Sequence, residues 1–345
     1  MRALRLHGAG DLRVDTVADP GPIGPGEVRL RNLLAGICGS DLHEYVHPML
    51  TTVEPHPLTG AALPQILGHE YSAEVLEVGD RVIAARTGDR VAVMPLFFCG
   101  ECGPCRAGLP QCCGRLGAVG MNWPWGGIAE TSVVQEHQVA VLPDAVSDAA
   151  GALVEPAAVA VHAVSRAPVR PGDSVLVAGG GPIGQLMCLA ALAAGADSVH
   201  ISEPADGRRR RAEALGAHAW QADAFPDGVD IAIECAGNQP ALRDCLAAVR
   251  RGGTVVQTAL HTKPVELDPR QLTLNDITLR GVNCFPVDSW PRVIELVASG
   301  ALPVERVVTG VVALGEAVEE GFDALLDPAG DQVKILVDPS DTRGP

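Results

Sequence analysis

The feature that most constrains how this chain folds is a glycine-rich hexapeptide, Gly-Gly-Gly-Pro-Ile-Gly, at residues 179–184. A short apolar run at 175–178 precedes it, and helix-forming residues follow it. Between a strand and a helix, glycines in the order G-x-G-x-x-G permit a tight turn, a close backbone approach to a pyrophosphate, and close helix–strand packing. The N–H groups and the positive dipole end of the helix then bind the phosphate. The cofactor-binding residues predicted from this loop are Gly179, Gly181, Pro182, Ile183 and Gly184.

An acidic residue indicates which cofactor binds. Glu203 directly follows the next strand-like run, 198–202, and lies 19 residues beyond Gly184. A carboxylate at this place accepts hydrogen bonds from the ribose hydroxyls of an adenosine and repels a 2′-phosphate, which predicts NAD rather than NADP. Arg208, on the helix expected next, is a candidate neighbour of the adenosine. A structural turn with a capping glutamate is the alternative interpretation.

The pattern of apolar residues changes near Ser147. Before it, strand-like runs separated by glycine- and proline-rich turns indicate a β-rich, barrel-like region. After it, strands alternate with helices, which predicts βαβ units and a parallel sheet, so the fold class is α/β. A chain of 345 residues suits two domains. Strands are expected at 27–35, 73–78, 89–94, 130–134, 173–178, 198–202, 230–234, 253–260 and 332–337, and helices at 156–167, 182–194, 206–215, 240–250, 290–299 and 315–326.

Composition excludes some classes of partner. The net charge of −16 argues against nucleic-acid binding, which needs clustered positive charge. The first residues lack the apolar stretch of a signal peptide, and the most apolar helical run, 186–194, is shorter than the ~20 residues of a membrane span. We therefore expect a cytoplasmic protein with no membrane partner. Its ten cysteines are expected to serve metal binding or burial rather than disulfides.

Four cysteines gather in one glycine- and proline-rich loop with the spacing C-x2-C-x2-C-x7-C. Four thiolates in a loop suit a tetrahedral zinc that is closed to substrate, so this site is expected to brace a lobe of the protein. A [4Fe–4S] cluster also takes four thiolates, but the glycines and the last spacing favour zinc. Cys112 adjoins the last ligand, for which we prefer Cys113. The predicted ligands of this structural zinc are Cys99, Cys102, Cys105 and Cys113.

A second, catalytic zinc site is expected from residues far apart in the sequence. Cys38 and His69 are two predicted ligands, and Glu70 or Glu155 supplies the third, because a catalytic zinc keeps three protein ligands and one exchangeable position. The remaining glutamate is expected beside the ligands, or as a replacement for water. Taken singly, His69 and Glu70 also fit a surface pair, and Glu155 fits a charge favoured at a helix N-terminus.

These motifs together resemble the zinc-containing medium-chain alcohol dehydrogenases over essentially the whole chain, with greatest similarity to the polyol and 2,3-butanediol dehydrogenase branch. The residues that carry the resemblance are 36–45, 55–60, 68–70, the four cysteines, Glu155-Pro156, 179–184 and 234–237. The resemblance implies a GroES-like catalytic domain at 1–152, to which 286–345 return, and a doubly wound Rossmann NAD-binding domain at 153–285. It also implies a homodimer or homotetramer with two zinc ions per chain, one catalytic and one structural.

The expected reaction is zinc-dependent hydride transfer between NAD and a secondary alcohol or a vicinal diol of the 2,3-butanediol type, with the ketone as the other small-molecule partner. Polyol (sorbitol-like), threonine and amino-sugar or cyclitol dehydrogenases of the same family are alternatives. A non-catalytic protein that binds NAD and zinc is an alternative of another class.

Two side chains near Cys38 offer a route for the proton that alcohol oxidation releases. Glycines at 36 and 39 predict a tight turn in this segment. Ser40 lies two residues after Cys38, so its hydroxyl can reach the substrate oxygen, and His43 can pass the proton to solvent because histidine titrates near neutral pH. The family resemblance assigns the relay to these same two positions. For His43, a solvent-exposed turn residue is the alternative interpretation.

One segment departs from the family pattern. Residues 121–125 contain Trp123 and Trp125, which are half of the four tryptophans in the chain. Their rings could form an aromatic wall that narrows the substrate pocket, or they could anchor the loop on the β-rich domain. The exact substrate therefore stays open at this stage.

Overall fold

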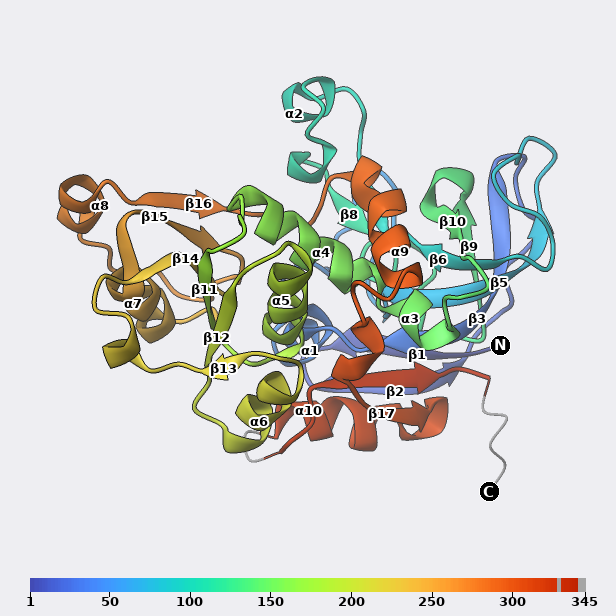
Figure 1. Cartoon of the computed structure of the whole chain (residues 1–345). Coiled ribbons are helices and arrows are strands. Elements are labelled where there is room, and N and C mark those ends of the chain that lie inside the picture. Colours follow the sequence, from blue (N-terminus) through green and yellow to red (C-terminus); the bar gives the residue numbers. More distant parts are fainter. Residues whose placement is uncertain (328–329, 341–345) are drawn as a thin grey trace. The chain divides into compact units, whose positions relative to one another are not determined.

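The computed structural model describes residues 1–327 and 330–340 and divides into two compact units (Figure 1). Unit 1 comprises Met1–Glu155, Pro286–Ser299 and the chain from Val308 onward, and unit 2 comprises Pro156–Phe285 and Gly300–Val307. Glu155 therefore belongs to unit 1, together with the other candidate ligands of the catalytic zinc.

Unit 2 is built on a six-stranded, fully parallel sheet with the strand order β13-β12-β11-β14-β15-β16. Numbered within the unit, this order is 3-2-1-4-5-6, that of a doubly wound dinucleotide-binding sheet. The strands are β11 (Ser174–Ala178), β12 (Ser198–Ser202), β13 (His218–Ala219), β14 (Val229–Glu234), β15 (Val249–Gln257) and β16 (Thr278–Gly281). The helices are α5 (Pro182–Ala193), α6 (Asp206–Ala214), α7 (Gln239–Ala248) and α8 (Pro269–Asn275), with 3-10 turns η3 (Ala222–Ala224) and η5 (Val304–Val307). Helix α4 (Val154–Arg166) begins in unit 1 and continues into unit 2.

The α/β class and the alternation of strands and helices are confirmed. The strand predicted at 198–202 coincides with β12, and the helices predicted at 182–194 and 206–215 match α5 and α6 to within one residue. Valine, isoleucine and alanine fill the strand interiors, because a parallel sheet is buried on both faces. Pro182 opens α5, since its missing N–H has no intrahelical partner to lose at the first helical position.

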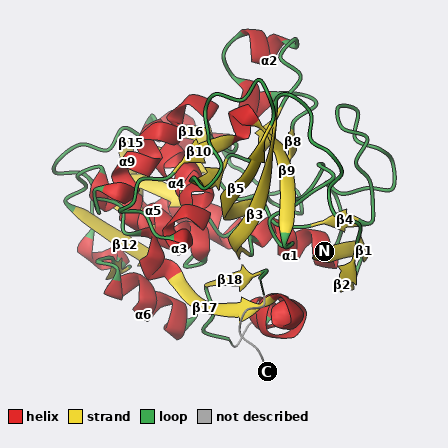
Figure 2. Cartoon of the chain, turned by 90° about the vertical axis from the view of Figure 1, so that its right-hand side faces the viewer, coloured by secondary structure: helices red, strands yellow, loops and turns green. Residues whose placement is uncertain are grey.

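Unit 1 contains a seven-stranded sheet with the order β10-β6-β5-β3-β18-β17, in which β9 also pairs with β3 (Figure 2). A three-stranded sheet, β2-β1-β4, and the pair β7-β8 are further parts of unit 1. The strands are β1 (Arg2–Gly8), β2 (Asp11–Thr16), β3 (Glu27–Gly36), β4 (Gln65–Ile66), β5 (Glu70–Val78), β6 (Arg90–Val93), β7 (Leu96–Phe97), β8 (Gly117–Ala118), β9 (Thr131–Gln135), β10 (Val139–Val141), β17 (Val308–Ala313) and β18 (Lys334–Asp338). The helices are α1 (Gly39–Val46), α2 (Gly103–Arg106), α3 (Asp148–Ala152), α9 (Trp290–Ala298) and α10 (Ala324–Leu326), with 3-10 turns η1 (Pro110–Cys112), η2 (Glu136–Gln138), η4 (Val287–Ser289) and η6 (Leu314–Glu316) and the π-helix η7 (Ala317–Asp323). The sheet's buried residues form one apolar cluster of mainly valine and leucine side chains.

Three neighbouring strands bring distant residues together at one end of this sheet. Gly36, the last residue of β3, pairs with Glu70, the first residue of β5, on one side and with Leu336 of β18 on the other. A Cβ atom on Gly36 would lie 2.2 Å from Glu70 Oε2, so only glycine leaves room for the carboxylate. Strand β18 begins at Lys334, which lies two residues from Leu336.

The segment after β3 differs from the expected turn. From Gly39 the chain forms helix α1, and Asp41 Oδ2 accepts a hydrogen bond from the Cys38 N–H at 2.9 Å. A carboxylate in the first helical turn that binds the preceding N–H satisfies a donor the helix leaves free, which favours helix initiation here. Because residues three apart share one face of a helix, Ser40 and His43 lie on the same side of α1.

Among the helices within residues 1–327 and 330–340, none combines the length and the apolar character that a membrane span requires.

A small aromatic cluster surrounds His200 on β12. Its ring centroid lies 5.6 Å from that of His218, 6.0 Å from that of Trp220 and 4.6 Å from that of Phe225. The imidazole is buried, and its Nε2 has no hydrogen-bond partner among the residues that the structure describes. Burial, reinforced by the nearby His218, lowers the pKa of His200. The folded state therefore favours the neutral ring.

We predict that the free energy of unfolding falls as the pH drops below about 6.5, the ordinary pKa of histidine. The folded-state pKa of His200 is depressed, so its contribution is full above the unfolded-state pKa and is lost as the pH falls through the folded-state value. His200→Phe should reduce the loss of stability between about pH 7 and pH 5 in urea unfolding followed by circular dichroism. The exposed His47→Gln serves as the control, and an unchanged pH dependence in His200→Phe would contradict the prediction.

Candidate metal centres and cofactor pocket

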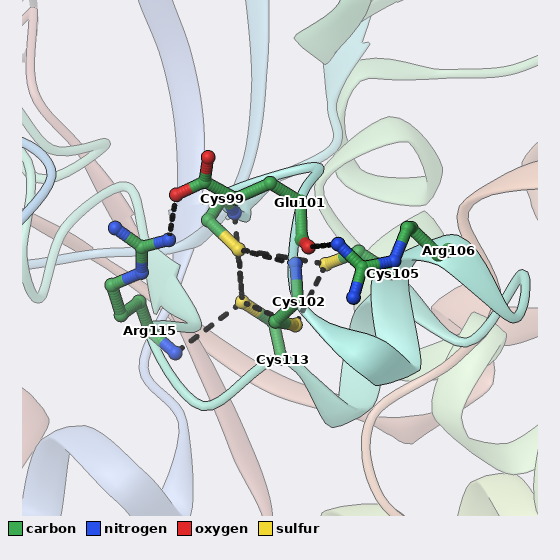
Figure 3. A network of polar contacts seen from close by, with 7 residues as sticks. All are labelled: Cys99, Glu101, Cys102, Cys105, Arg106, Cys113 and Arg115. Atoms are coloured by element: carbon green, nitrogen blue, oxygen red, sulfur yellow. Dashed lines mark hydrogen bonds and ion pairs between the residues drawn. The ribbon is translucent and has the colours of Figure 1, made fainter.

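Four thiol groups converge in the loop around α2, which stands away from the seven-stranded sheet of unit 1 (Figures 1 and 3). Four of the sulfur–sulfur distances between Cys99, Cys102, Cys105 and Cys113 are 3.4–3.9 Å. A disulfide needs about 2.05 Å, so these residues are free thiols. Four sulfurs about 2.3 Å from one tetrahedral zinc would lie about 3.8 Å apart, so the four cysteines fit a single zinc ion.

The cysteine spacing leaves two choices open: zinc or a [4Fe–4S] cluster, and Cys113 or Cys112 as the last ligand. An iron–sulfur cube would hold its thiolates farther apart, because the cluster itself lies between them. Cys113 is buried and its Sγ lies 3.5 Å from that of Cys99, whereas Cys112 is exposed. The arrangement therefore favours zinc over the cluster and Cys113 over Cys112.

The electrostatics of this loop also favour a cation. Backbone N–H groups, first that of Glu101, lower the pKa of Cys99 to about 6. Burial and the neighbouring sulfurs raise the pKa of Cys105 to about 12. Around the rim, Arg115 pairs with the Glu101 carboxylate and Arg106 donates to the Glu101 carbonyl (Figure 3).

We predict that Cys113→Ser lowers the zinc content by one ion per chain and lowers the midpoint of thermal unfolding by about 5 °C or more, because the loop loses its brace. Cys112→Ser is the matched control, since the adjacent thiol is exposed and should change neither value. Elemental analysis and a thermal scan measure both effects. Equal zinc loss in the two variants would contradict the assignment.

The candidate catalytic ligands Cys38, His69 and Glu70 come together within unit 1, each with one ligand atom within 4.8 Å of the others. His69 Nδ1 lies 3.4 Å from Asp41 Oδ1, and His69 Nε2 lies 3.2 Å from Ser40 Oγ. A metal-binding histidine usually turns its second nitrogen toward a carboxylate. Asp41 is therefore placed to orient the ring, which leaves Nε2 for a metal.

These three donors fit a zinc ion. Burial alone would lower the pKa of His69, but Asp41 and Cys38 raise it well above its usual range, so the site favours positive charge. Glu70 is fully buried, and its Oε1 has no hydrogen-bond partner within the described part of the chain. Such an oxygen is costly unless something binds it, and a metal ion would do so. Thiolate, imidazole and carboxylate are all common zinc ligands.

Two further candidate residues, Glu155 and His43, lie outside this group of three donors. Glu155 is buried near His69 and Glu70 but does not join their close group. Burial, with a contribution from Glu70, raises the pKa of Glu155 to about 7. His43 is exposed on α1, one turn after the half-buried Ser40.

Unit 2 contains a cavity of about 810 Å³ that Gly179, Gly181, Glu203 and Arg208 help to line. Its lining follows the carboxyl ends of β11, β12 and β14, where the strand order reverses and doubly wound sheets bind their ligands. Gly179 has a φ of 111°, which favours glycine. A Cβ on Gly181 would meet no atom within 4 Å, so this glycine leaves open space before α5, where a phosphate fits.

The remaining residues of the glycine loop act through packing and helix formation. A Cβ on Gly184 would lie 1.8 Å from the Gly179 carbonyl oxygen, so this glycine permits the close contact between α5 and the loop. Pro182 and Ile183 form the first turn of α5. These roles correspond to those that the motif predicts.

The Glu203 carboxylate is fixed at the edge of the cavity. Its Oε2 accepts the Gly180 N–H at 2.7 Å, and its Oε1 accepts the Ala205 N–H at 2.8 Å. Each carboxylate oxygen keeps a further lone pair for a ligand. Arg208 lines the same cavity, and its buried Nε has no hydrogen-bond partner among the described residues.

Beside this cavity lies a buried acid, Glu234, which contributes to the family resemblance and to which the sequence assigned no role. Glu234 ends β14, and its Oε1 accepts the N–H groups of Ala236 at 2.8 Å and Gly237 at 2.7 Å. Its Oε2 lies 3.3 Å from His261 Nε2. Because Ala236 lines the cavity, Glu234 supports the wall on which a cofactor would lie. A carboxylate at the end of an otherwise apolar strand was the available signal.

Asp41 and Lys334 were also missed beside the catalytic-metal cluster. Lys334 Nζ donates to Glu70 Oε2 at 2.6 Å and to the Ile37 carbonyl at 2.9 Å. The signal for Lys334 was a single charge in the apolar run 333–337, in a chain with two lysines and 24 arginines. For Asp41, which lies in a segment expected to be a tight turn, no pattern indicated a role.

The two tryptophans anchor their loop. The indole N–H of Trp123 donates to the Val133 carbonyl at 2.8 Å, and its ring lies 5.5 Å from that of Phe97. Trp125 packs on a small cluster that includes Ala3 and Ile66. These contacts favour the anchor interpretation over the aromatic wall.

Comparison with known proteins agrees with this architecture. Residues 24–144 match the family model of the alcohol dehydrogenase GroES-like domain, and residues 182–299 match that of the zinc-binding dehydrogenases. The chain is 36% identical to the (R,R)-butanediol dehydrogenase of Bacillus subtilis over 99% of this chain and 100% of the relative. It is 30% identical to a sorbitol dehydrogenase of the same organism, over 99% and 98%.

The fold is also similar to those of solved dehydrogenase structures. The crystal structure of 2R,3R-butanediol dehydrogenase from Bacillus subtilis matches with a TM-score of 0.91 and 36% identity, covering 98% of this chain and 99% of that one. A zinc-binding dehydrogenase from Sinorhizobium meliloti, bound to NADP, matches with a TM-score of 0.88 and 31% identity, covering 98% and 99%. The chain therefore belongs to the zinc-binding, medium-chain alcohol dehydrogenase family, and the expected resemblance is confirmed. It is an oxidoreductase with a GroES-like domain and a dinucleotide-binding sheet.

Proposed function

We propose that this protein is a zinc-dependent dehydrogenase that transfers hydride between NAD and a secondary alcohol or a vicinal diol of the 2,3-butanediol type. The observation that carries the proposal is the convergence of Cys38, His69 and Glu70, with the Ser40 hydroxyl 3.2 Å from His69 Nε2. The butanediol dehydrogenase similar to this chain along its full length supports the diol. The sorbitol dehydrogenase among its relatives keeps a polyol as the second candidate.

Two zinc ions per chain follow from the two donor sets. Cys99, Cys102, Cys105 and Cys113 would hold the structural ion, and Cys38, His69 and Glu70 would hold the catalytic one, with Glu155 beside it. A zinc ion at the catalytic site supplies a Lewis acid that makes the substrate hydroxyl more acidic. Asp41 would orient His69, since its Oδ1 lies 3.4 Å from His69 Nδ1.

The chain's own side chains provide the proton route. Ser40 Oγ, 3.2 Å from His69 Nε2, would accept the proton of the substrate hydroxyl. His43, which is exposed and one turn later on α1, would release it to solvent. NAD, when bound, accepts the hydride.

In unit 2, Gly179, Gly181 and the first turn of α5 with Pro182, Ile183 and Gly184 would bind the pyrophosphate. The fixed carboxylate of Glu203 would accept the ribose hydroxyls, and Arg208 would contact the adenosine. The negative charge of Glu203 would repel a 2′-phosphate, so NAD is the proposed cofactor, although one relative was crystallised with NADP.

We further propose that residues 1–152 and 286–345 act as the catalytic domain and residues 153–285 as the NAD-binding domain, in a homodimer or homotetramer. The ten cysteines, which form no disulfide among the described residues, support a reducing, cytoplasmic environment.

We predict that the zinc-loaded protein forms NADH with (R,R)-2,3-butanediol, and that Cys38→Ala lowers kcat by more than about 100-fold, because a ligand of the proposed metal is lost. The variant should keep its fold, the zinc of the four-cysteine loop and NADH binding. Absorbance at the NADH band and calorimetry measure these properties, with Cys112→Ser as the active control. Absence of turnover with butanediol and with a polyol panel would overturn the proposal.

We predict that Glu203→Gln lowers kcat/KM for NAD by about 10- to 100-fold, from the ~1.5–3 kcal/mol of hydrogen bonds to a charged group. The same change should improve the relative use of NADP, because the charge that repels its phosphate is gone. Glu213→Gln makes the same charge change at an exposed site of α6 and should leave both values unaltered. An unchanged NAD-to-NADP ratio in Glu203→Gln would contradict the role.

A further inference from the structure

Lys334 is a buried cation whose role the proposed reaction leaves unexplained. Its side chain is 1% exposed, and burying an ammonium group is costly unless it is paired. Its Nζ has two partners, Glu70 Oε2 at 2.6 Å and the Ile37 carbonyl at 2.9 Å. Glu70 is itself a candidate metal ligand, and Ile37 directly precedes another, Cys38.

The strand register explains how this contact forms. Gly36 ends β3, Glu70 opens β5 on one side of it, and Lys334 opens β18 on the other. Since Gly36 has no side chain, the Glu70 carboxylate can lie where its Cβ would be, and the Lys334 ammonium reaches it there. The contact joins residues 264 positions apart in the sequence, so it belongs to the assembled sheet.

The two oxygens of Glu70 are therefore in different environments. Oε2 is held by Lys334, whereas Oε1 is buried and has no hydrogen-bond partner among the described residues. Cys38 and His69 each offer a ligand atom within 4.8 Å of a Glu70 carboxylate oxygen. Because Oε2 is already bonded to Lys334, Oε1 is the oxygen that needs a partner.

We propose that Lys334 is a positioning residue of the catalytic-metal site: it holds Oε2 of Glu70 so that Oε1 serves as the third protein ligand, in place of Glu155. The proposal rests on the proposed function only in that Cys38, His69 and Glu70 bind zinc. The use of lysine in a chain with 24 arginines fits this role. A compact ammonium fits a fully buried space where a planar guanidinium has five donors to satisfy.

If Lys334 positions Glu70, its removal should change the zinc affinity in one direction; if its charge acts only through Coulomb repulsion of the zinc ion, removal should change the affinity in the other. Removal of a positive charge beside a cation should, by Coulomb attraction alone, tighten zinc binding. Loss of an oriented ligand should weaken it, by about 10- to 100-fold for a residue that orients a metal ligand. The direction of the change therefore separates the two.

The experiment is a double-mutant cycle on the full-length zinc protein with Lys334→Met, Glu70→Gln and the double variant, in which zinc affinity is measured by chelator competition. Lys334→Met should weaken zinc binding at the catalytic site by about 10- to 100-fold, while the zinc of the four-cysteine loop stays tightly bound as an internal control. In the Glu70→Gln background, Lys334→Met should change the affinity less than about twofold, because the carboxylate it positions is absent. If Lys334→Met does not fold, Lys334→Leu, which also removes the donor to Glu70 Oε2, takes its place.

Unchanged or tighter zinc binding in Lys334→Met would overturn the proposal, as would an equal loss in the Glu70→Gln background. These outcomes would leave the proposed function intact, provided that the unmodified protein binds two zinc ions and turns over the diol. An unmodified protein with one zinc ion, bound only by the four-cysteine loop, would overturn both proposals.

Discussion

The ion pair between Glu70 and Lys334, formed across the bare backbone of Gly36, is the contact on which the catalytic-metal site depends. Both side chains are buried at one end of the seven-stranded sheet, where unpaired charge would be strongly unfavourable. A buried pair of this kind contributes little net stability, because desolvation cancels much of the attraction. Its consequence is orientation, since the carboxylate is fixed at one oxygen and leaves the other for a metal.

The donor side chains of the two metal centres are brought together in different ways. In the four-cysteine loop, all donors come from 15 consecutive residues, and the ion would replace a hydrophobic core that so short a loop cannot form. In the catalytic centre, Cys38 directly precedes α1, His69 directly precedes β5, and Glu70 is the first residue of β5, so the donors come from segments that only the folded sheet brings together. The first arrangement suits a brace, and the second suits a site that must keep one position open.

The parts of this protein that the sequence predicts are those encoded by local spacing. The four cysteines, the glycine loop at 179–184 and the strand at 198–202 each depend on neighbours within a few residues. In the structure the four thiols lie close together, α5 begins within the glycine loop, and 198–202 is a strand. The helical form of α1 was missed, because the glycines at 36 and 39 dominate the local pattern while Asp41, whose carboxylate binds the Cys38 N–H, carries no distinctive signal.

The sequence does not predict how distant strands align with one another. Whether Glu70 or Glu155 approaches Cys38 depends on how β5, β3 and β18 align, and no local pattern encodes that alignment. The same is true of Lys334, whose partner lies 264 residues away. The choice between a loop anchor and an aromatic wall for Trp123 likewise depends on a distant contact, because its indole N–H donates to a carbonyl group on β9.

Anomalous X-ray diffraction at the zinc absorption edge, from crystals of the protein purified with its native metal, would locate both metal ions directly. We expect two zinc peaks per chain, one among the sulfurs of Cys99, Cys102, Cys105 and Cys113, and one bound by Cys38 Sγ, His69 Nε2 and Glu70 Oε1. A single peak in the four-cysteine loop, or a second zinc bound by Glu155 with Glu70 turned away, would contradict these ligand assignments.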